Sequence, residues 1–229
     1  LPIDKFIFMK IAKEGTVSSV YFPERDAVKL VNTPTADIFD ADISEPVKVS
    51  FYNGTKVIDA LSHFNGDVQG RIKYTEYDGE LMASDFILEN EDLQINLACT
   101  DPSLSFMEMS KEETDRAFGT DSKMFSFDLL TTHVDKMKSL FNLDKDEDIF
   151  TLYIGEKGIN IKGTSYDATL CHSYDSDVEK GAKVVIYKKY INLLDKENYK
   201  VSVCENKVVF KSLDTNTHLT VAVAITDED

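Results

Sequence analysis

The sequence is poor in cysteine, and its few cysteines form no recognisable site. Cys99, Cys171 and Cys204 lie far apart along 229 residues and make no CxxC pair. An odd and sparse set of this kind indicates reduced, structural thiols in an intracellular protein. The sequence therefore excludes a disulfide-stapled domain.

Patterns that carry catalytic or metal chemistry are also missing. The four histidines have no HExxH or other metal spacing, and no Walker-type loop or GxSxG motif occurs. The acidic run Asp144–Asp148 resembles a calcium loop, but Ile149 replaces the required glycine and Gly155 the required glutamate. We expect no metal, no cofactor and no enzyme; an enzyme with a cleft between two domains is the weaker alternative.

Long apolar runs are absent as well. No segment approaches the ~20 apolar residues that span a bilayer, and the first residues lack the layout of a signal peptide. With 25 basic against 41 acidic residues the formal charge is −16, which argues against a basic nucleic-acid surface over the whole chain. We expect a cytoplasmic protein without a membrane partner.

The chain does contain an internal repeat. The stretch Val47–Phe64 is similar to Ala182–Val203: an alternating strand ends in an aromatic position and is followed by a short helical run. Periodicity extends this pattern to four units, each with a helix followed by three strands. The sequence predicts an α+β fold with two domains, residues 1–100 and 124–229, each a doubled strand–helix–three-strand unit, joined by a connector over residues 101–123.

The predicted elements follow from period-two and period-3.6 patterns and from turn residues. Three units have a leading strand, and the first begins directly at a helix over Ile3–Glu14. The other helices are predicted over 55–64, 131–143 and 188–195, and the leading strands over 47–52, 124–129 and 183–187. The remaining strands are predicted over 17–22, 27–31, 36–43, 71–76, 80–86, 93–99, 149–154, 159–163, 168–174, 199–204, 207–212 and 218–225.

Positive charge is concentrated on the predicted helices. The segments 4–14, 54–64, 131–144 and 188–196 hold nine lysines against six acids, a net charge of +3, while the rest sums to −19. Lysine suits any exposed helix face, which is one explanation. The other is a helical face that meets phosphate without reading bases; its candidate residues are Lys5, Lys10, Lys13, Lys56, Lys136, Lys138, Lys188 and Lys189.

Four stretches, together with the order of the elements, resemble a known family. They are VNTPTADIFDADI (31–43), LQINLACTDPS (93–103), IGEKGINIKG (154–163) and NYKVSV (198–203). They are similar to the DNA sliding clamps, polymerase processivity factors, and among these to the trimeric clamps of T-even-like bacteriophages. The resemblance implies a head-to-tail homotrimeric ring, with antiparallel sheets outside and helices lining a hole that holds duplex DNA.

The resemblance further implies several partners. A clamp-loader ATPase opens the ring, the polymerase binds by a C-terminal peptide, and the loaded clamp acts on late transcription machinery. Subunits would join through two strand edges, one with Leu93, Ile95, Leu97 and Cys99 and the other with Ala168, Leu170, His172 and Tyr174. The peptide pocket would be lined by Phe106, Met107, Met109, Phe210, Leu219 and Val223. A viral processivity factor that binds DNA by a basic face without forming a ring is the alternative.

Overall fold

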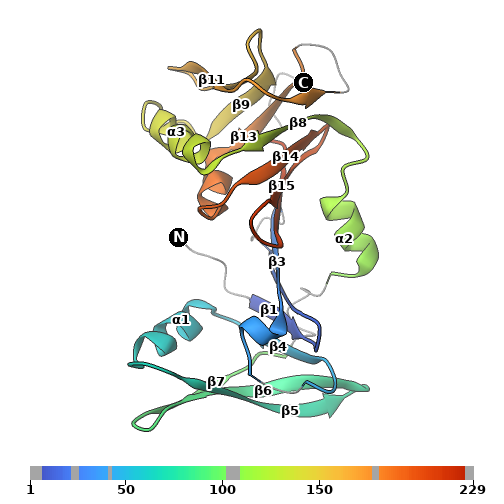
Figure 1. Cartoon of the computed structure of the whole chain (residues 1–229), viewed down its shortest axis with the longest axis vertical. Helices are drawn as coiled ribbons and strands as arrows, with labels where there is room; N and C mark the ends of the chain where they lie inside the picture. Colours follow the sequence, from blue (N-terminus) through green and yellow to red (C-terminus); the bar gives the residue numbers. More distant parts are fainter. Residues whose placement is uncertain (1–6, 22–25, 41–42, 102–108, 177–180, 225–229) are drawn as a thin grey trace. The chain divides into compact units, whose positions relative to one another are not determined.

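The computed structural model describes residues 7–21, 26–40, 43–101, 109–176 and 181–224 (Figure 1). The chain forms two compact units that divide after Glu112, inside the stretch that the sequence predicts to be a connector. Each unit is considered by itself below.

The second unit contains two antiparallel sheets. One sheet has the strand order β12-β8-β14-β15-β16 and the other has the order β11-β10-β9-β13. The strands are β8 (Lys123–Leu129), β9 (Ile149–Ile154), β10 (Ile159–Lys162), β11 (Asp167–Cys171), β12 (Asp175–Ser176), β13 (Lys183–Tyr187), β14 (Tyr199–Cys204), β15 (Lys207–Ser212) and β16 (Thr217–Ala222).

The two leading strands of this unit are exchanged between the sheets. β8 precedes α3 (Thr131–Phe141) but pairs with β14, with Leu129 opposite Tyr199. β13 precedes the 3-10 helix η3 (Lys188–Leu193) but pairs with β9, with Tyr187 opposite Ile149. Each half therefore completes the sheet of the other half, so the doubled unit folds as one body. The predicted α+β class with antiparallel sheets is confirmed.

Alternating apolar residues build the core of this unit. Phe125, Phe127 and Leu129 occupy one face of β8 and are 0–2% exposed. In α3, Val134 and Met137 are three residues apart and are both buried, as a helical stripe requires. The sequence predicted these faces correctly, because period-two and period-3.6 patterns are strong over these segments.

A helix that the sequence did not predict, α2 (Lys111–Phe118), lies within the connector stretch. Its last turn is bound to the second unit, because Lys207 Nζ and Thr220 Oγ1 both donate to the carbonyl oxygen of Ala117, at 3.1 and 3.0 Å. These bonds satisfy carbonyl groups that a helix end leaves without partners. The Phe118 ring also packs edge-on against His218, with centroids 5.6 Å apart.

In the first unit the later elements match the prediction. They are β4 (Val47–Phe51), α1 (Thr55–Ser62), β5 (Gln69–Tyr77), β6 (Glu80–Glu89) and β7 (Gln94–Ala98). The β5–β6 hairpin turns at Asp78 and Gly79, which both have positive φ, as the sequence Asp-Gly predicts. A core cluster that includes Val49, Phe51 and Phe86 lies beneath these strands.

The prediction for the start of this unit is wrong. The predicted helix Ile3–Glu14 is replaced over its described part by β1 (Ile7–Ile11), which pairs with β2 (Thr16–Tyr21) and β4. β3 (Ala27–Thr33) follows, and the predicted strand 36–43 begins instead as a 3-10 turn, η1 (Thr35–Asp37). The strands predicted over 17–22 and 27–31 match β2 and β3 to within two residues, so only the helix and the strand predicted from residue 36 are wrong.

Candidate nucleic-acid face and assembly edges

Two of the predicted DNA-binding lysines lie on α3. Lys136 and Lys138 are on turns whose other side buries Val134 and Met137, and Lys136 is exposed while Lys138 is half-buried. The Lys136 ammonium donates a hydrogen bond to the carbonyl oxygen of Thr169 in β11. This lysine therefore also fastens the helix to an edge strand.

The lysines of η3 are held by aromatic rings. Lys188 Nζ donates to the carbonyl oxygen of Asp144 at 2.6 Å and lies 5.5 Å from the centre of the Phe141 ring. Lys189 Nζ lies 5.2 and 5.1 Å from the rings of Tyr187 and Tyr190. Lys188 is thus directed toward its own unit, whereas Lys189 is an exposed cation supported by two rings.

The first unit does not present the expected lysine-bearing helix at its start. Lys10 lies in β1 and Lys13 in the turn that follows it, so neither is on a helix; Lys5 lies outside the described residues. Lys56 is exposed in the first turn of α1. The other exposed residues of α1 are mixed: Ile58 and Leu61 are 62% and 44% exposed, and Thr55, Asp59 and Ser62 are polar.

β7 and β11 each have one side that pairs with no strand in the described part of the chain. β7 pairs with β6, and β11 pairs with β10. Ile95, Leu97 and Cys99 face inward and pack against the core cluster of the first unit. These two strands are the ones that the resemblance to sliding clamps implies as subunit edges.

The residues predicted for the second edge do not share one face of the strand. A bulge at Leu170 shifts the register between β10 and β11, so that Thr169 is opposite Asn160 and Cys171 is opposite Ile159. Ala168 and Cys171 therefore share the inward face, and Leu170 is buried beside them. His172 is exposed and Tyr174 is half-buried.

The thiols near these edges are free. Burial, with a smaller contribution from Asp85, raises the pKa of Cys99 to about 12, and burial also raises the pKa of Cys171. Both side chains are therefore thiols rather than thiolates at neutral pH. Such groups are poor nucleophiles and oxidise slowly, in keeping with a structural role.

Two of the predicted peptide-pocket residues lie in the core of the second unit. Phe210 and Leu219 face each other across β15 and β16 and are 2% and 0% exposed. They are therefore too deeply buried to line a surface pocket. The alternating pattern predicts which residues share a face of the strand, but it does not predict whether that face is covered. Val223 and Met109 are half-buried, and Phe106 and Met107 lie outside the described residues.

A hollow of about 390 Å³ lies between the free edge strand and the start of α3. We call it the edge hollow; it is lined by Asp128, Leu130, His133, Leu170, Cys171, His172 and Ser173. The His133 Nδ1 accepts a hydrogen bond of 3.1 Å from the Leu130 N–H, which fixes its ring at the helix N-terminus. Burial, then Lys136, lowers the pKa of His133, so this imidazole adds no positive charge to the hollow at neutral pH, and Asp128 is the acidic residue of the lining.

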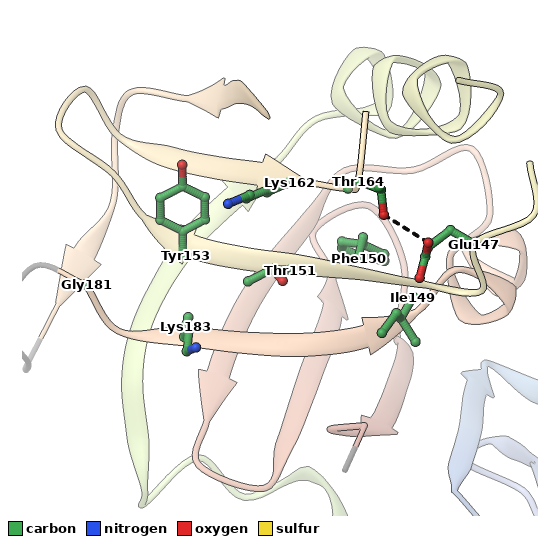
Figure 2. A pocket seen from close by; sticks show the side chains of 10 residues that line it. Glu147, Ile149, Phe150, Thr151, Tyr153, Lys162, Thr164, Gly181 and Lys183 are labelled. Carbon is green, nitrogen blue, oxygen red and sulfur yellow. Dashed lines mark hydrogen bonds between the residues drawn. The ribbon is translucent and has the colours of Figure 1, made fainter. Parts of the chain in front are cut away.

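A second hollow, of about 630 Å³, lies on the outward face of the β11-β10-β9-β13 sheet (Figure 2). Tyr153, Lys162 and Lys183 project into it from β9, β10 and β13, and on its rim Thr164 donates to Glu147 at 2.9 Å. The Tyr153 hydroxyl donates to Asp167, 2.7 Å from each carboxylate oxygen. The lining thus contains two lysines and one carboxylate, Glu147, and Asp167 lies next to it through Tyr153.

Neither hollow contains a metal site. Among the described residues, no group of three or more His, Cys, Asp or Glu side chains is placed to hold a metal ion. The helices in that part of the chain are also too short or too polar to cross a membrane.

Comparison with known proteins finds similarity in the fold but not in the sequence. No protein-family model matches the sequence, and no curated protein matches it significantly. Solved structures do match. PCNA of A. fulgidus, bound to the C-terminal region of FEN-1, aligns with 99% of this chain and 92% of its own, at 14% identity and a TM-score of 0.63.

Entamoeba histolytica PCNA aligns with 97% of this chain and 91% of its own, at 13% identity and a TM-score of 0.64. The chain has the sliding-clamp fold. The H. pylori beta clamp, also 13% identical, gives a TM-score of 0.66 over 97% of this chain. Only 56% of that beta clamp is covered, so this clamp-fold chain spans little more than half of the bacterial protein.

Proposed function

We propose that this chain is a sliding clamp: copies join head to tail in a closed ring that encircles duplex DNA and tethers a replicative polymerase. The observation that carries the proposal is the pair of free strand edges, β7 in the first unit and β11 in the second. A contact between an edge of one unit and a different edge of the other unit in the next copy is heterologous, and such contacts close into a ring when the rotation allows it. We propose three copies.

The charge distribution supports a ring that holds DNA loosely. Among the described helices, α1, α3 and η3 contain five lysines and two aspartates, a net charge of +3 in a chain of −16, whereas α2 and η1 each sum to −1. A few lysines near phosphates release counterions without reading sequence, and an acidic exterior discourages contact with DNA elsewhere. We propose that Lys56, Lys138 and Lys189 lie toward the duplex, with Lys136 at the subunit boundary.

The mechanism follows from topology rather than affinity. A closed ring stays on DNA because the duplex cannot leave it unless a subunit boundary opens, so processive synthesis needs no tight contact between protein and DNA. Strong contacts with phosphate would slow sliding. The protein performs no reaction of its own in this scheme; opening is the task of a clamp-loader ATPase, and the polymerase is retained by a C-terminal peptide.

Additional roles belong to the same proposal. The resemblance to T-even-like phage clamps extends it to late transcription, in the cytoplasm of an infected bacterium.

The residues that receive the polymerase peptide are different from Phe210 and Leu219, whose burial removes them from the surface. Met109 and Val223 remain the proposed members of that site within the described residues.

The mass of the assembly in solution tests the proposal. We expect a species near three times the 25.8 kDa of one chain, in equilibrium with single chains on dilution. Negative-stain images of this species should show a central opening. A protein that stays a single chain at high concentration is not a ring, and the non-ring processivity factor then becomes the better hypothesis.

A further inference from the structure

The two free edges are poorly defended against pairing, unlike a third edge of the first unit. β7 has no charged residue and β11 has only Asp167. β5 also has a free side in the described part of the chain, but it carries exposed Arg71 and Lys73 and an irregular register after Lys73. Charges are a usual protection of an edge strand, so β7 and β11 are less protected than β5, although β11 shares with β5 an irregular register.

The apolar pattern fixes how these two strands meet. Apart from a two-residue parallel contact between β4 and β6, the described strands within each unit pair in antiparallel fashion. Antiparallel pairing is also the more stable kind. The inward side chains of β7 are Ile95 and Leu97, and those of β11 flanking its bulge are Ala168 and Cys171. The inward faces form one continuous surface only if Leu97 is opposite Ala168 and Ile95 opposite Cys171.

This register places Leu93 opposite Ser173, at the mouth of the edge hollow. Leu93 lies two residues before Ile95 and four before Leu97, so its side chain points to the same inward face of the strand. It is 37% exposed in a single chain. On the other copy the mouth of the hollow presents Leu130, which is 44% exposed.

Both partners are held in place before they meet. The Leu93 N–H donates to Asn90 Oδ1 at 2.9 Å, and its carbonyl oxygen accepts from the Asn90 N–H at 3.0 Å. On the other side, His172 Nδ1 bonds the carbonyl oxygen of Lys157 at 2.9 Å, which holds the chain next to Ser173. Contacts between groups that are already ordered cost less entropy on binding.

We propose that Leu93 of one copy inserts into the edge hollow of the next copy, against Leu130 and Leu170, and so sets the register of the subunit boundary. This inference rests on the proposed assembly and specifies its anchor. The hollow, at about 390 Å³, exceeds the ~30 Å³ share of one water by more than tenfold, which leaves room for a leucine side chain. Loss of that apolar burial weakens each boundary by roughly 10- to 100-fold.

Cross-linking tests the register directly. In a background with the native cysteines replaced by serine, the pair Leu93→Cys and Ser173→Cys would have Cα atoms about 5 Å apart between copies, within disulfide range. Mild oxidation should give covalent dimers and trimers on denaturing gels. In the control pair Leu93→Cys and Thr169→Cys, the bulge places Thr169 opposite Asn96, three residues from Leu93 and about 10 Å along the strand, so this pair should stay uncross-linked.

A second variant keeps the wild-type cysteines. Leu93→Asp should shift the assembly toward single chains by at least tenfold in concentration, measured by light scattering. Leu213→Asp, a change of the same kind at a leucine that is 55% exposed in a loop, should leave it unchanged.

The outcomes separate the two proposals. If the wild-type chain assembles but the control pair cross-links instead, or if Leu93→Asp assembles like the wild type, the Leu93 anchor is wrong while the ring survives. If the wild-type chain never assembles, both are wrong. Cross-linking of the Leu93–Ser173 pair together with a dissociating Leu93→Asp variant supports both.

Discussion

The backbone N–H of Ala224 donates a hydrogen bond of 2.8 Å to the carbonyl oxygen of Val185, just beyond the end of β16. In the first unit the Thr100 N–H donates to the Ser50 carbonyl oxygen at 2.7 Å, just beyond the end of β7. When Phe51 is aligned with Ile186, Ser50 falls on Val185. Both units therefore close with the same bond between the last strand and the leading strand, although the side chains differ.

Replacement of Gly158 by alanine should damage the second edge strand. Gly158 has φ +144°, which other residues rarely adopt, and an added Cβ would lie 2.1 Å from the Cys171 carbonyl oxygen and 2.7 Å from the His172 Cα. Both atoms are main chain, so the end of β11 must move. We expect a loss of about 2–4 kcal/mol, from strain and the clash together, in urea unfolding.

Gly181→Ala is the matched control for that change. Gly181 also has a positive φ, +102°, but nothing lies within 4 Å of an added Cβ. Only the conformational strain applies, and about 1 kcal/mol should be lost. Equal losses at the two glycines would show that the close approach of Gly158 to β11 is unimportant.

Much of the fold was predictable because turn residues and alternation agree. The bounds of β9, β14 and β15 match the prediction residue for residue. β9 and β14 alternate buried and half-buried side chains, β15 has a short apolar run from Val208 to Phe210, and each is followed by a polar or glycine-containing turn. The bulge at Leu170 has no such signal, because an inserted residue is revealed only by its partner strand.

The first helix was mispredicted because its residues satisfy two periods. Ile3, Ile7 and Ile11 recur every four residues, as on a helix, yet Ile7–Ile11 has the β-branched and aromatic content of a strand. Pairing with β2 on one side and β4 on the other decides the outcome. The edge hollow was beyond prediction for a similar reason, since it joins residues 128–133 to residues 170–173, with no local pattern.

Truncation of Leu219 should test its reassignment from the peptide pocket to the core. Leu219→Ala removes a fully buried side chain that packs opposite Phe210, and we expect the free energy of unfolding of the second unit to fall by about 2–5 kcal/mol. Val223→Ala, at a half-buried position, should cost about 1 kcal/mol. A Leu219→Ala variant with wild-type stability would return this residue to the surface.

The stability of the second unit should rise between pH 5.5 and pH 7.5. Burial lowers the pKa of both His133 and His218 in the folded state, with smaller contributions from Lys136 and Lys211. Near pH 6.5 the unfolded chain therefore binds more protons than the folded chain, so stability is lost as the pH falls. Urea midpoints across this range should flatten in a His133→Gln, His218→Gln variant but not in His63→Gln, which alters an exposed histidine of the first unit.

Reversal of charge on the helices should weaken DNA binding without affecting assembly. Lys138→Glu with Lys189→Glu removes two cations from α3 and η3. We expect lower affinity for a short duplex at low salt and a decrease of about 2 in the slope of log affinity against log salt, because each lost phosphate contact releases about one fewer counterion. Fluorescence anisotropy measures both. The matched control is Lys162→Glu with Lys183→Glu, which changes the net charge equally on the outward sheet face shown in Figure 2. If the control pair weakens binding as much as the helix pair, the effect is one of net charge and the helices do not face the duplex.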